Sequence, residues 1–236
     1  MRVVDRGPYY DKRRTFFIED NFGWYVDIHQ WTKLAADAGT SVAHVGDGVP
    51  PHVLLTTGAT DENECMLRST NESFLFASDK PLFGEARIQY AEANTDDANV
   101  FFGFIDAAGA NLLVDAGAGP KTTASGVGIF KVDGGTVWKC WSSKSTTQTT
   151  TASTKTAGGT AYQVLAVEAQ PVNSTELMCY FLVDGEQLVD TNGKPISQLV
   201  TFASATEMHF VPCYVKAGGA NSETPKISNA FASQLR

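Results

Sequence analysis

The chain has 236 residues, of which 43% are hydrophobic and 11% aromatic, which is ample material for a globular core. Only 19% of the residues are charged, and 18 Lys and Arg side chains against 26 Asp and Glu side chains give a net charge of −8. This composition excludes a collagen-like or low-complexity chain. It also argues against binding to nucleic acid or to an anionic membrane, because both need a basic protein surface.

The first fourteen residues form a basic N-terminal arm. Asp5 and Asp11 are its acidic residues, and five cationic side chains give the arm a local charge of +3. Because the whole chain carries −8, residues 15–236 carry −11. Such an arm is commonly a solvated terminus, and it is also suited to docking on an acidic partner surface. The candidate partner-binding residues are Arg2, Arg6, Lys12, Arg13 and Arg14.

The N-terminus and the cysteines predict synthesis in a reducing cytoplasm. Residues 1–8 contain no apolar stretch of the kind found in secretory signals. The longest apolar run, residues 177–183, is far shorter than the ~20 residues of a membrane-spanning helix. No CxxC pair is present, which argues against a zinc knuckle or a thioredoxin-like site. We expect all four cysteines to be reduced packing residues: Cys65, Cys140, Cys179 and Cys213.

Strand signals dominate the first part of the chain after the arm. Residues 15–18 and 23–26 are rich in β-forming side chains and are separated by a polar turn. Residues 31–38, followed by a glycine, are a short helical candidate, and no long amphipathic helix pattern appears. One glycine-rich and proline-rich stretch, residues 46–51, predicts a loop, and residues 53–57 predict the next strand.

Period-2 alternation is clearest over residues 85–90. Ala86, Ile88 and Tyr90 share one face of the predicted strand, and the polar residues between them face the other way. The apolar run that follows, residues 100–105, predicts a more deeply buried strand. Its Gly103 indicates a bulge or a close backbone approach.

Short Asp-Gly turns predict two hairpins in the second half of the chain. One joins residues 126–132 to residues 136–141, and the other joins residues 180–183 to residues 187–189. Between them, residues 146–156 contain seven threonines. We interpret this stretch as a long hairpin or edge strand rather than a linker, because threonine is β-branched.

The last predicted strands cover residues 208–215 and 226–231. Pro212 suggests that the first of these is an edge strand or carries a bulge. Many short strands with turn signals between them predict an all-β sandwich. We therefore expect a single β-sandwich domain over residues 15–236, preceded by the arm, residues 1–14.

Motifs that carry chemistry are missing from the sequence. The four histidines form no HxH or HExxH pair, and no GxSxG elbow, Walker A loop or GxGxxG turn is present. His44 or His52 near Asp47 could coordinate a metal, but loop histidines more often act as ordinary polar residues. We expect no catalytic residue, no metal site and no cofactor.

A β-sandwich of this size could be a glycanase, which needs two carboxylates about 5 Å apart in its retaining form. Glu62 and Glu64 alternate as such a pair would on a strand. Their segment is polar and turn-like, so a solvated loop is the better interpretation. We expect the protein not to be an enzyme.

Aromatic side chains could instead stack on sugar rings, as in a lectin. Trp24, Trp31, Trp138 and Trp141 are available, and a regular strand places Trp138 and Trp141 on opposite faces, so that one of them is a candidate for exposure. Packing in the core is the more common role of aromatic residues on strands.

The segment from about Phe16 to Phe231 resembles the concanavalin A-like jelly roll, of the laminin-G-like kind common among tailed-phage genomes. Residues 55–64, 83–88 and 94–103 carry the resemblance, together with the strand and Asp-Gly turn of residues 180–185. The resemblance implies a two-sheet antiparallel jelly-roll sandwich. Glycan-binding members of that class use loop carboxylates and often calcium, and hydrolytic members use an alternating acidic strand; neither feature is clear in this sequence.

The resemblance implies a virion component of a tailed phage. A stand-alone jelly roll with a short N-terminal arm resembles a capsid decoration (cement) protein, which would be made in the host cytoplasm and bind the major capsid protein on the capsid surface. A homo-oligomer is expected, with a trimer favoured because it suits three-fold positions of a shell. The alternative is a lectin-like appendage that binds host glycans.

Overall fold

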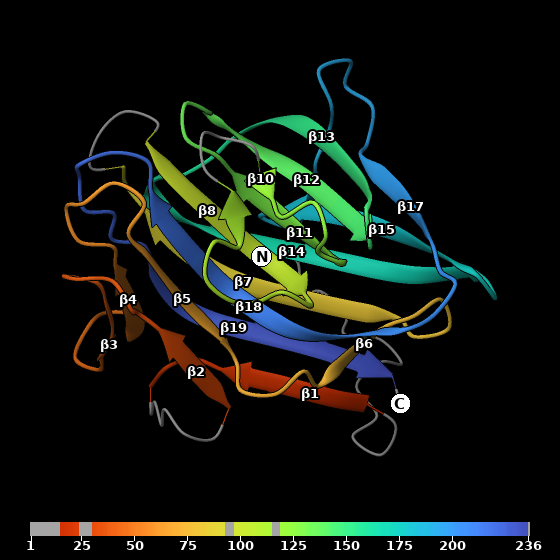
Figure 1. Ribbon diagram of the computed structural model, residues 1–236, viewed down its shortest axis with the longest axis horizontal. Helices are drawn as coiled ribbons and strands as arrows, with labels where there is room; N and C mark the ends of the chain where they lie inside the picture. Colours follow the sequence, from red (N-terminus) through yellow and green to blue (C-terminus); the bar gives the residue numbers. More distant parts are fainter. Residues whose placement is uncertain (1–14, 24–29, 93–96, 115–118, 236) are drawn as a thin grey trace.

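The computed structural model describes residues 15–23, 30–92, 97–114 and 119–235. Within those ranges every regular element is a β-strand (Figure 1). Two antiparallel sheets face one another and form a sandwich, as the sequence predicts. No helix in the described part of the chain is long and apolar enough to cross a membrane.

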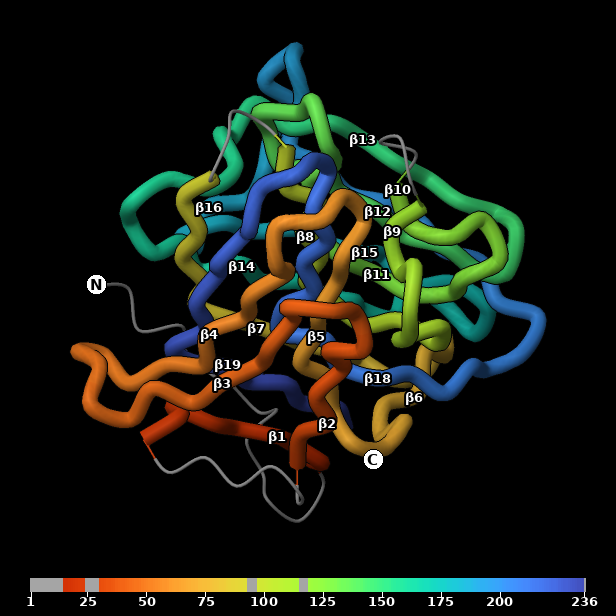
Figure 2. The backbone as a smooth tube through the Cα atoms, turned by 60° about the vertical axis from the view of Figure 1, so that its left-hand side comes forward, coloured from red at the N-terminus to blue at the C-terminus, as the bar shows by residue number. Residues whose placement is uncertain are grey.

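Sheet A has the strand order β16-β15-β14-β7-β19-β4-β3, with β1 paired to β19 and β17 paired to β15. Its strands are β1 (Thr15–Asp20), β3 (Ser41–Val45), β4 (His52–Thr56), β7 (Leu82–Tyr90), β14 (Gly159–Asn173), β15 (Glu176–Val183), β16 (Glu186–Gln187), β17 (Ser197–Thr201) and β19 (Lys226–Leu235). The first and last described strands, β1 and β19, therefore lie side by side (Figure 2).

Sheet B has the order β13-β12-β11-β8-β18-β5-β2, with β6 paired to β18. Its strands are β2 (Trp31–Leu34), β5 (Glu64–Ser69), β6 (Phe74–Phe76), β8 (Ala98–Ile105), β11 (Gly126–Lys131), β12 (Val137–Lys144), β13 (Thr147–Thr156) and β18 (Thr206–Ala217). A separate pair, β9 (Leu113–Val114) with β10 (Gly119–Pro120), lies in the connection from β8 to β11.

Aromatic rings fill the space between the sheets. Phe74 packs edge-on against Phe104 with ring centroids 5.0 Å apart, and Phe210 lies 5.0 Å from Phe104 and 5.9 Å from Phe102. Each of these rings is fully buried. Burial of such large apolar surfaces is the main favourable contribution to folding, so this cluster holds the two sheets together.

The strand with the clearest alternation is observed as predicted. Along β7, buried and half-buried residues alternate over all nine positions, with Ala86, Ile88 and Tyr90 in the core. In β8 every residue is buried, because both faces of that strand are covered. Gly103 makes the close backbone approach that the sequence predicts, since a Cβ there would lie 2.3 Å from the Val127 carbonyl oxygen.

Both Asp-Gly hairpins form. The first joins β11 to β12, and the second joins β15 to β16 through Asp184 and Gly185, whose φ angles are 55° and 80°. Positive φ at two successive residues is the geometry that a tight hairpin turn requires. The threonine-rich stretch is also confirmed as a strand, because β13 pairs with β12 at the edge of sheet B.

One predicted helix is wrong. Residues 31–34 form strand β2, which pairs with β5, and the residues after it turn. The Trp31 indole N–H donates a 2.8 Å hydrogen bond to Asp20, and its ring lies 5.9 Å from that of Phe22. These tertiary contacts outweigh a weak local helix preference.

Pro212 marks a bulge and not a sheet edge. It lies in β18, the central strand between β8 and β5, where the pairing register shifts between Val211 and Tyr214. The prediction of a strand over residues 23–26 concerns residues 24–26, which lie outside the described residues.

A second apolar cluster covers the outer face of sheet B. The β8–β11 connection, which contains β9 and β10, lies beside β11 and β12 (Figures 1 and 2). Leu112, Leu113 and Ala124 of this connection are buried with side chains of sheet B: Met66, Phe101, Ile105, Phe130, Trp141, Val211 and Tyr214. Sheet B is thus enclosed by sheet A on one side and by this covering segment on the other.

Candidate functional site

His44 and His52, the two candidate metal ligands, each lie within hydrogen-bond distance of a backbone carbonyl oxygen in a loop. The His44 Nε2 atom lies 2.6 Å from the Phe22 carbonyl oxygen, and the His52 Nδ1 atom lies 3.0 Å from the Pro50 carbonyl oxygen. In the part of the chain that the structure describes, no group of three or more His, Cys, Asp or Glu side chains is arranged to hold a metal ion.

Glu64 is not the solvated loop residue that the sequence predicts. It begins β5, points to the outer face of sheet B and is 6% exposed. Its carboxylate accepts the backbone N–H of Asn111 at 2.8 Å and the Tyr214 hydroxyl at 2.5 Å. A buried carboxylate is stable only with such donors, so Glu64 fixes the covering segment to the sheet.

The same arrangement keeps the Tyr214 hydroxyl protonated. Burial under the covering segment, together with the negative charge and the hydrogen bond of Glu64, raises the pKa of the Tyr214 hydroxyl well above its ordinary value. Lys216 lies nearby and donates a 3.0 Å hydrogen bond to the Asn111 side chain. These contacts are structural, and they leave the Glu64 carboxylate with little access to a substrate.

Trp138 and Trp141 lie on opposite faces of β12, as predicted, but neither is exposed. Trp138 is in the core between the sheets and donates to Gln163, whereas Trp141 is under the covering segment. Both are 0% exposed. Packing in the core, the role that the sequence analysis favours, is therefore confirmed. The alternative, exposure of one ring for stacking on a sugar, is wrong because a second layer covers the outer face of the strand. Trp24 lies outside the described residues.

The outer face of sheet A carries a different set of side chains from that of sheet B. Strand pairing places its side chains in rows across six strands, from β17 through β15, β14, β7 and β19 to β1. One row contains Ser197, Tyr180, Glu168, Phe83, Ser233 and Phe17, and the next contains Leu182, Ala166, Glu85, Phe231 and Glu19. Apolar and acidic side chains thus share one face.

One side of this face is apolar. We define the β15–β17 patch as Met178, Tyr180 and Leu182 on β15 with Leu199 on β17. Leu199 pairs directly with Met178 and is 47% exposed, and the three β15 residues are half-buried. Contiguous apolar residues at the surface are typical of a binding interface.

The other side of the face combines aromatic and acidic side chains. We define the β1–β7–β19 patch as Phe17 and Glu19 on β1, Phe83 and Glu85 on β7, and Phe231 and Ser233 on β19. Glu19 and Glu85 flank Phe231 in one row, and the Phe83 and Phe231 rings lie 6.0 Å apart. Arg87, one row away, stacks on the Tyr162 ring at 4.0 Å and donates to Ser228.

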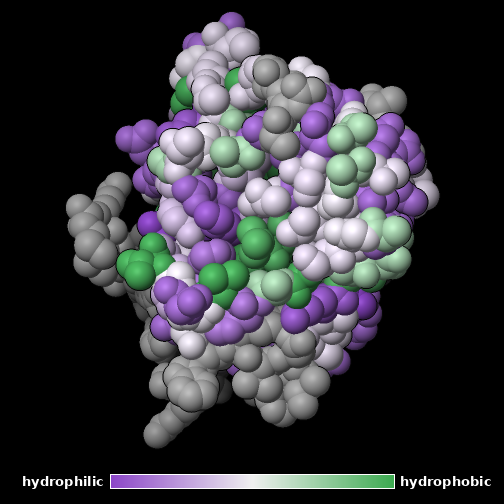
Figure 3. Space-filling model, turned by 90° about the vertical axis from the view of Figure 1, so that its left-hand side faces the viewer, coloured by the Kyte–Doolittle hydropathy of each residue, from purple (hydrophilic) through white to green (hydrophobic). Residues whose placement is uncertain are grey.

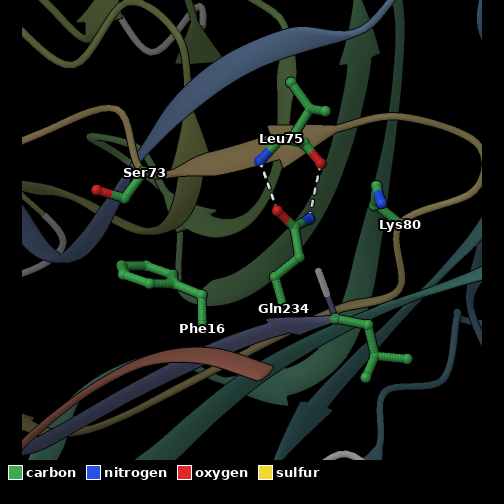
Figure 4. Close-up of a pocket in the computed structure, with 6 residues that line it drawn as sticks. Phe16, Ser73, Leu75, Lys80 and Gln234 are labelled. Atoms are coloured by element: carbon green, nitrogen blue, oxygen red, sulfur yellow. Dashed lines mark hydrogen bonds between the residues drawn. The ribbon is translucent and has the colours of Figure 1, made fainter. Parts of the chain in front are cut away.

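A shallow pocket of about 300 Å³ lies between the two sheets near the end of β19. Phe16, Ser73, Leu75, Lys80, Gln234 and Leu235 line it (Figure 4). The Gln234 amide exchanges two 2.7 Å hydrogen bonds with the Leu75 backbone, which links β19 to β6 (Figure 4). Both polar atoms of the Gln234 amide are therefore hydrogen-bonded, and Gln234 links the two sheets.

The end of the sandwich that carries the β3–β4 hairpin is mostly polar, with small apolar areas among the polar atoms (Figure 3). Val49, in the loop of that hairpin, is fully exposed. All five predicted partner-binding residues lie outside the described residues: Arg2, Arg6, Lys12, Arg13 and Arg14.

No model of a known protein family matches this sequence, and no curated protein sequence matches it. Solved structures do match its fold. The carbohydrate recognition domain of Emp47p is similar with a TM-score of 0.61 and 10% identity, over 95% of this chain and 98% of that one. Peanut lectin in complex with a nine-residue peptide matches with a TM-score of 0.54 and 13% identity, over 94% and 97% of the two chains.

Enzymes share the same architecture. The endo-β-1,4-glucuronan lyase of the fungus Trichoderma reesei has a TM-score of 0.59 and 10% identity, over 94% of this chain and 96% of that one. At these identities the similarity establishes the fold alone. The chain is therefore an all-β, two-sheet antiparallel sandwich of the concanavalin A-like, lectin-like jelly-roll type.

Proposed function

We propose that this protein is a phage virion component, a capsid decoration protein that binds the major capsid protein on the outside of the head. The β15–β17 patch is the observation that carries the proposal, because it presents Met178, Tyr180, Leu182 and Leu199 on one sheet face. The resemblance of the sequence to phage-type jelly rolls supports the identity of the partner.

The proposed role is non-enzymatic. Glu64 is engaged by Asn111 and Tyr214, and the face of sheet B that carries it is covered by the protein's own chain. Hydrolysis of β-glucans that disappears in Glu62→Gln or Glu64→Gln variants would contradict this part of the proposal.

Capsid attachment is tested by co-sedimentation of the purified protein with capsid shells that lack it. We expect a Met178→Asp/Leu199→Asp double variant to lose binding by tenfold or more, because two apolar contacts are replaced by charges that must be desolvated. Thr150→Asp, at an exposed position of β13 in sheet B, is the matched control and should bind as the unmodified protein does. Equal binding by both variants would overturn the proposed interface.

The basic arm is proposed as a second contact with the shell. Deletion of residues 1–14 should weaken capsid attachment and leave the sandwich folded. We propose a homo-oligomer, a trimer by preference, since three-fold symmetry matches three-fold positions of a shell. Light scattering coupled to size-exclusion chromatography gives the copy number, and a monomeric mass at micromolar concentration would contradict it.

Binding of host glycans is the second candidate function. The fold similarity to the Emp47p carbohydrate recognition domain and to peanut lectin supports it. A glycan array probed with and without calcium tests it, and binding that persists in the Met178→Asp/Leu199→Asp variant would separate this function from capsid attachment.

A further inference from the structure

The tip of the β3–β4 hairpin presents an apolar side chain to solvent. Val49 is fully exposed, whereas the other exposed large apolar side chains in the described part of the chain are 38–53% exposed. The loop is held by its own contacts, since the His52 Nδ1 atom lies 3.0 Å from the Pro50 carbonyl oxygen and a Cβ at Gly48 would lie 2.8 Å from the His52 ring. An apolar tip that is already held in place loses little conformational entropy when a partner buries it.

An apolar recess lies elsewhere on the surface. The pocket at the end of β19 has a volume of about 300 Å³, and Leu75 and Leu235 contribute apolar side chains to its lining. This volume corresponds to about ten water molecules of about 30 Å³ each, so the isopropyl side chain of Val49 fits with room for an adjoining proline ring. The Gln234 amide is occupied by the Leu75 backbone (Figure 4), so the recess favours an apolar occupant over one that needs hydrogen bonds.

The tip and the pocket also carry opposite charges. Asp47, two residues before Val49, is exposed at the tip. Lys80 lines the pocket and forms no ion pair with any residue that the structure describes, its neighbour Asp79 included. Copies of a chain whose residues 15–236 carry −11 repel one another on average, so a cation beside an apolar recess marks a place where an acidic tip is attracted.

The tip cannot enter the pocket of its own chain. β4 pairs with β19 at Lys226 and Ile227, whereas the pocket lies at the other end of that strand, beside Leu235. Strand β1 pairs with residues 230–235 along the same edge of β19, and its six residues place about 20 Å of strand between the hairpin and the pocket. The hairpin and β6 accordingly lie on opposite sides of the molecule (Figures 1 and 2).

From these observations we infer that the hairpin tip of one copy inserts Val49 into the β19 pocket of a second copy, with Asp47 paired to Lys80. The inference names the contact between copies, so it rests on the homo-oligomer of the proposed function and not on capsid attachment. Because the two surfaces differ and lie on opposite sides, the contact is heterologous. Each copy provides one tip and one pocket, and a ring such as the proposed trimer uses all of them.

Disulfide trapping tests the contact directly. Val49→Cys and Ser73→Cys replace an exposed tip residue and an exposed residue that lines the pocket, and the native cysteines are buried. After mild oxidation of an equal mixture of the two variants, we expect peptide mass spectrometry to find a disulfide between positions 49 and 73. Thr191→Cys, exposed in another loop, is the matched control and should link to position 73 at least tenfold less often. Equal linking of positions 49 and 191 to position 73 would overturn the inference.

The strength of association gives an independent readout. Val49→Asp should raise the dissociation constant of the oligomer by tenfold or more, because a charge would have to be buried in the pocket, and the fold should be unaffected since the side chain is exposed. Asp47→Lys and Lys80→Glu should each weaken association about twofold to fivefold, and the double variant should recover most of that loss because the pair forms again with its charges reversed. Analytical ultracentrifugation over a concentration series measures these constants.

The outcomes separate this contact from the proposed function. An oligomer with the same dissociation constant in the native protein and in Val49→Asp, and with no link between positions 49 and 73, would overturn the inference and leave the homo-oligomer standing. A native protein that is monomeric at every concentration would overturn both. Capsid attachment through the β15–β17 patch would in either case be decided by co-sedimentation.

Discussion

The Tyr214 hydroxyl donates a 2.5 Å hydrogen bond to a Glu64 carboxylate oxygen beneath the segment that covers sheet B. The two residues are 150 positions apart in the sequence and lie on neighbouring strands, β18 and β5. Because the Asn111 backbone N–H binds the same carboxylate, this pair connects the sheet to its covering segment. The covering segment is therefore an integral part of the fold.

Replacing Tyr214 with Phe should destabilise the protein by about 1–3 kcal/mol, because a buried carboxylate loses a donor without gaining another. Urea unfolding followed by tryptophan fluorescence measures the change in free energy. Tyr162→Phe is the control, since Tyr162 is half-buried and its ring contact with Arg87 is kept. A Tyr214→Phe variant as stable as the control would show that Glu64 does not depend on this hydroxyl.

The four cysteines should be inert in the native protein. All are free and buried, and burial raises the pKa of the Cys65 and Cys179 thiols to about 12. A thiol reagent such as DTNB at pH 8 should therefore react with none of them natively and with four after unfolding. Rapid native reaction of even one thiol would contradict the burial.

The same shifts predict loss of stability in alkali. Thiols in the unfolded chain ionise near pH 9, whereas in the folded chain they stay protonated until about pH 12. A raised folded pKa adds stability that is fully present below the unfolded pKa and is lost as the pH rises toward the folded pKa. The free energy of unfolding should thus be constant from pH 7 to 8 and fall above pH 9, and Cys179→Ala should flatten that fall.

Gly103→Ala should destabilise the protein by about 3 kcal/mol or more, because φ is 147° and the new methyl group would lie 2.3 Å from the Val127 carbonyl oxygen. Gly134→Ala is the matched control: φ is 70°, but nothing lies within 4 Å of the added carbon. Its cost should be about 1–2 kcal/mol from backbone strain alone. Equal melting temperatures for the two variants would contradict the close approach of β8 to β11.

The buried pair of Lys131 and Glu92 should contribute more than a surface pair. Lys131 is 1% exposed and its Nζ atom lies 2.6 Å from Glu92, while Lys155 and Asp184 form a 3.2 Å pair that is about 40% exposed. Glu92→Ala should cost about 3 kcal/mol because it removes a carboxylate that lies 2.6 Å from the ammonium group of a buried lysine. Lys155→Ala should cost at most about 1 kcal/mol. Chemical denaturation of both variants measures the change in the free energy of unfolding that each substitution causes.

Local sequence patterns predicted the strands whose environment is local. The alternation of Ala86, Ile88 and Tyr90 and the Asp184-Gly185 turn depend on neighbouring residues, so the local sequence predicts both. The local pattern around Trp31 predicts a helix, whereas its strand is determined by contacts with Asp20, Phe22 and β5 that lie outside that local window.

The covering segment was beyond local prediction for the same reason. The polar neighbours of Glu64 predict a solvated turn, whereas its donors come from Asn111 and Tyr214, which lie far along the chain. Strand geometry predicts the direction of the Trp141 side chain but not the segment that covers it, so the sequence leaves exposure of this ring open. In the register of β5 and β18 the partner of Glu64 is Lys216, and Tyr214 lies opposite Met66, so the contact is diagonal and has no local sequence signal.

The β8–β11 connection also limits how far protein engineering can shorten this part of the chain. Beneath it lies a floor of aromatic side chains on adjacent strands: Phe101, Phe130, Trp141 and Tyr214. Shortening the connection around β9 and β10 should therefore expose apolar rings to water and lower the solubility of the protein, provided that Asn111 is kept as a donor to Glu64. The native chain thus keeps four aromatic rings out of the solvent with its own loop.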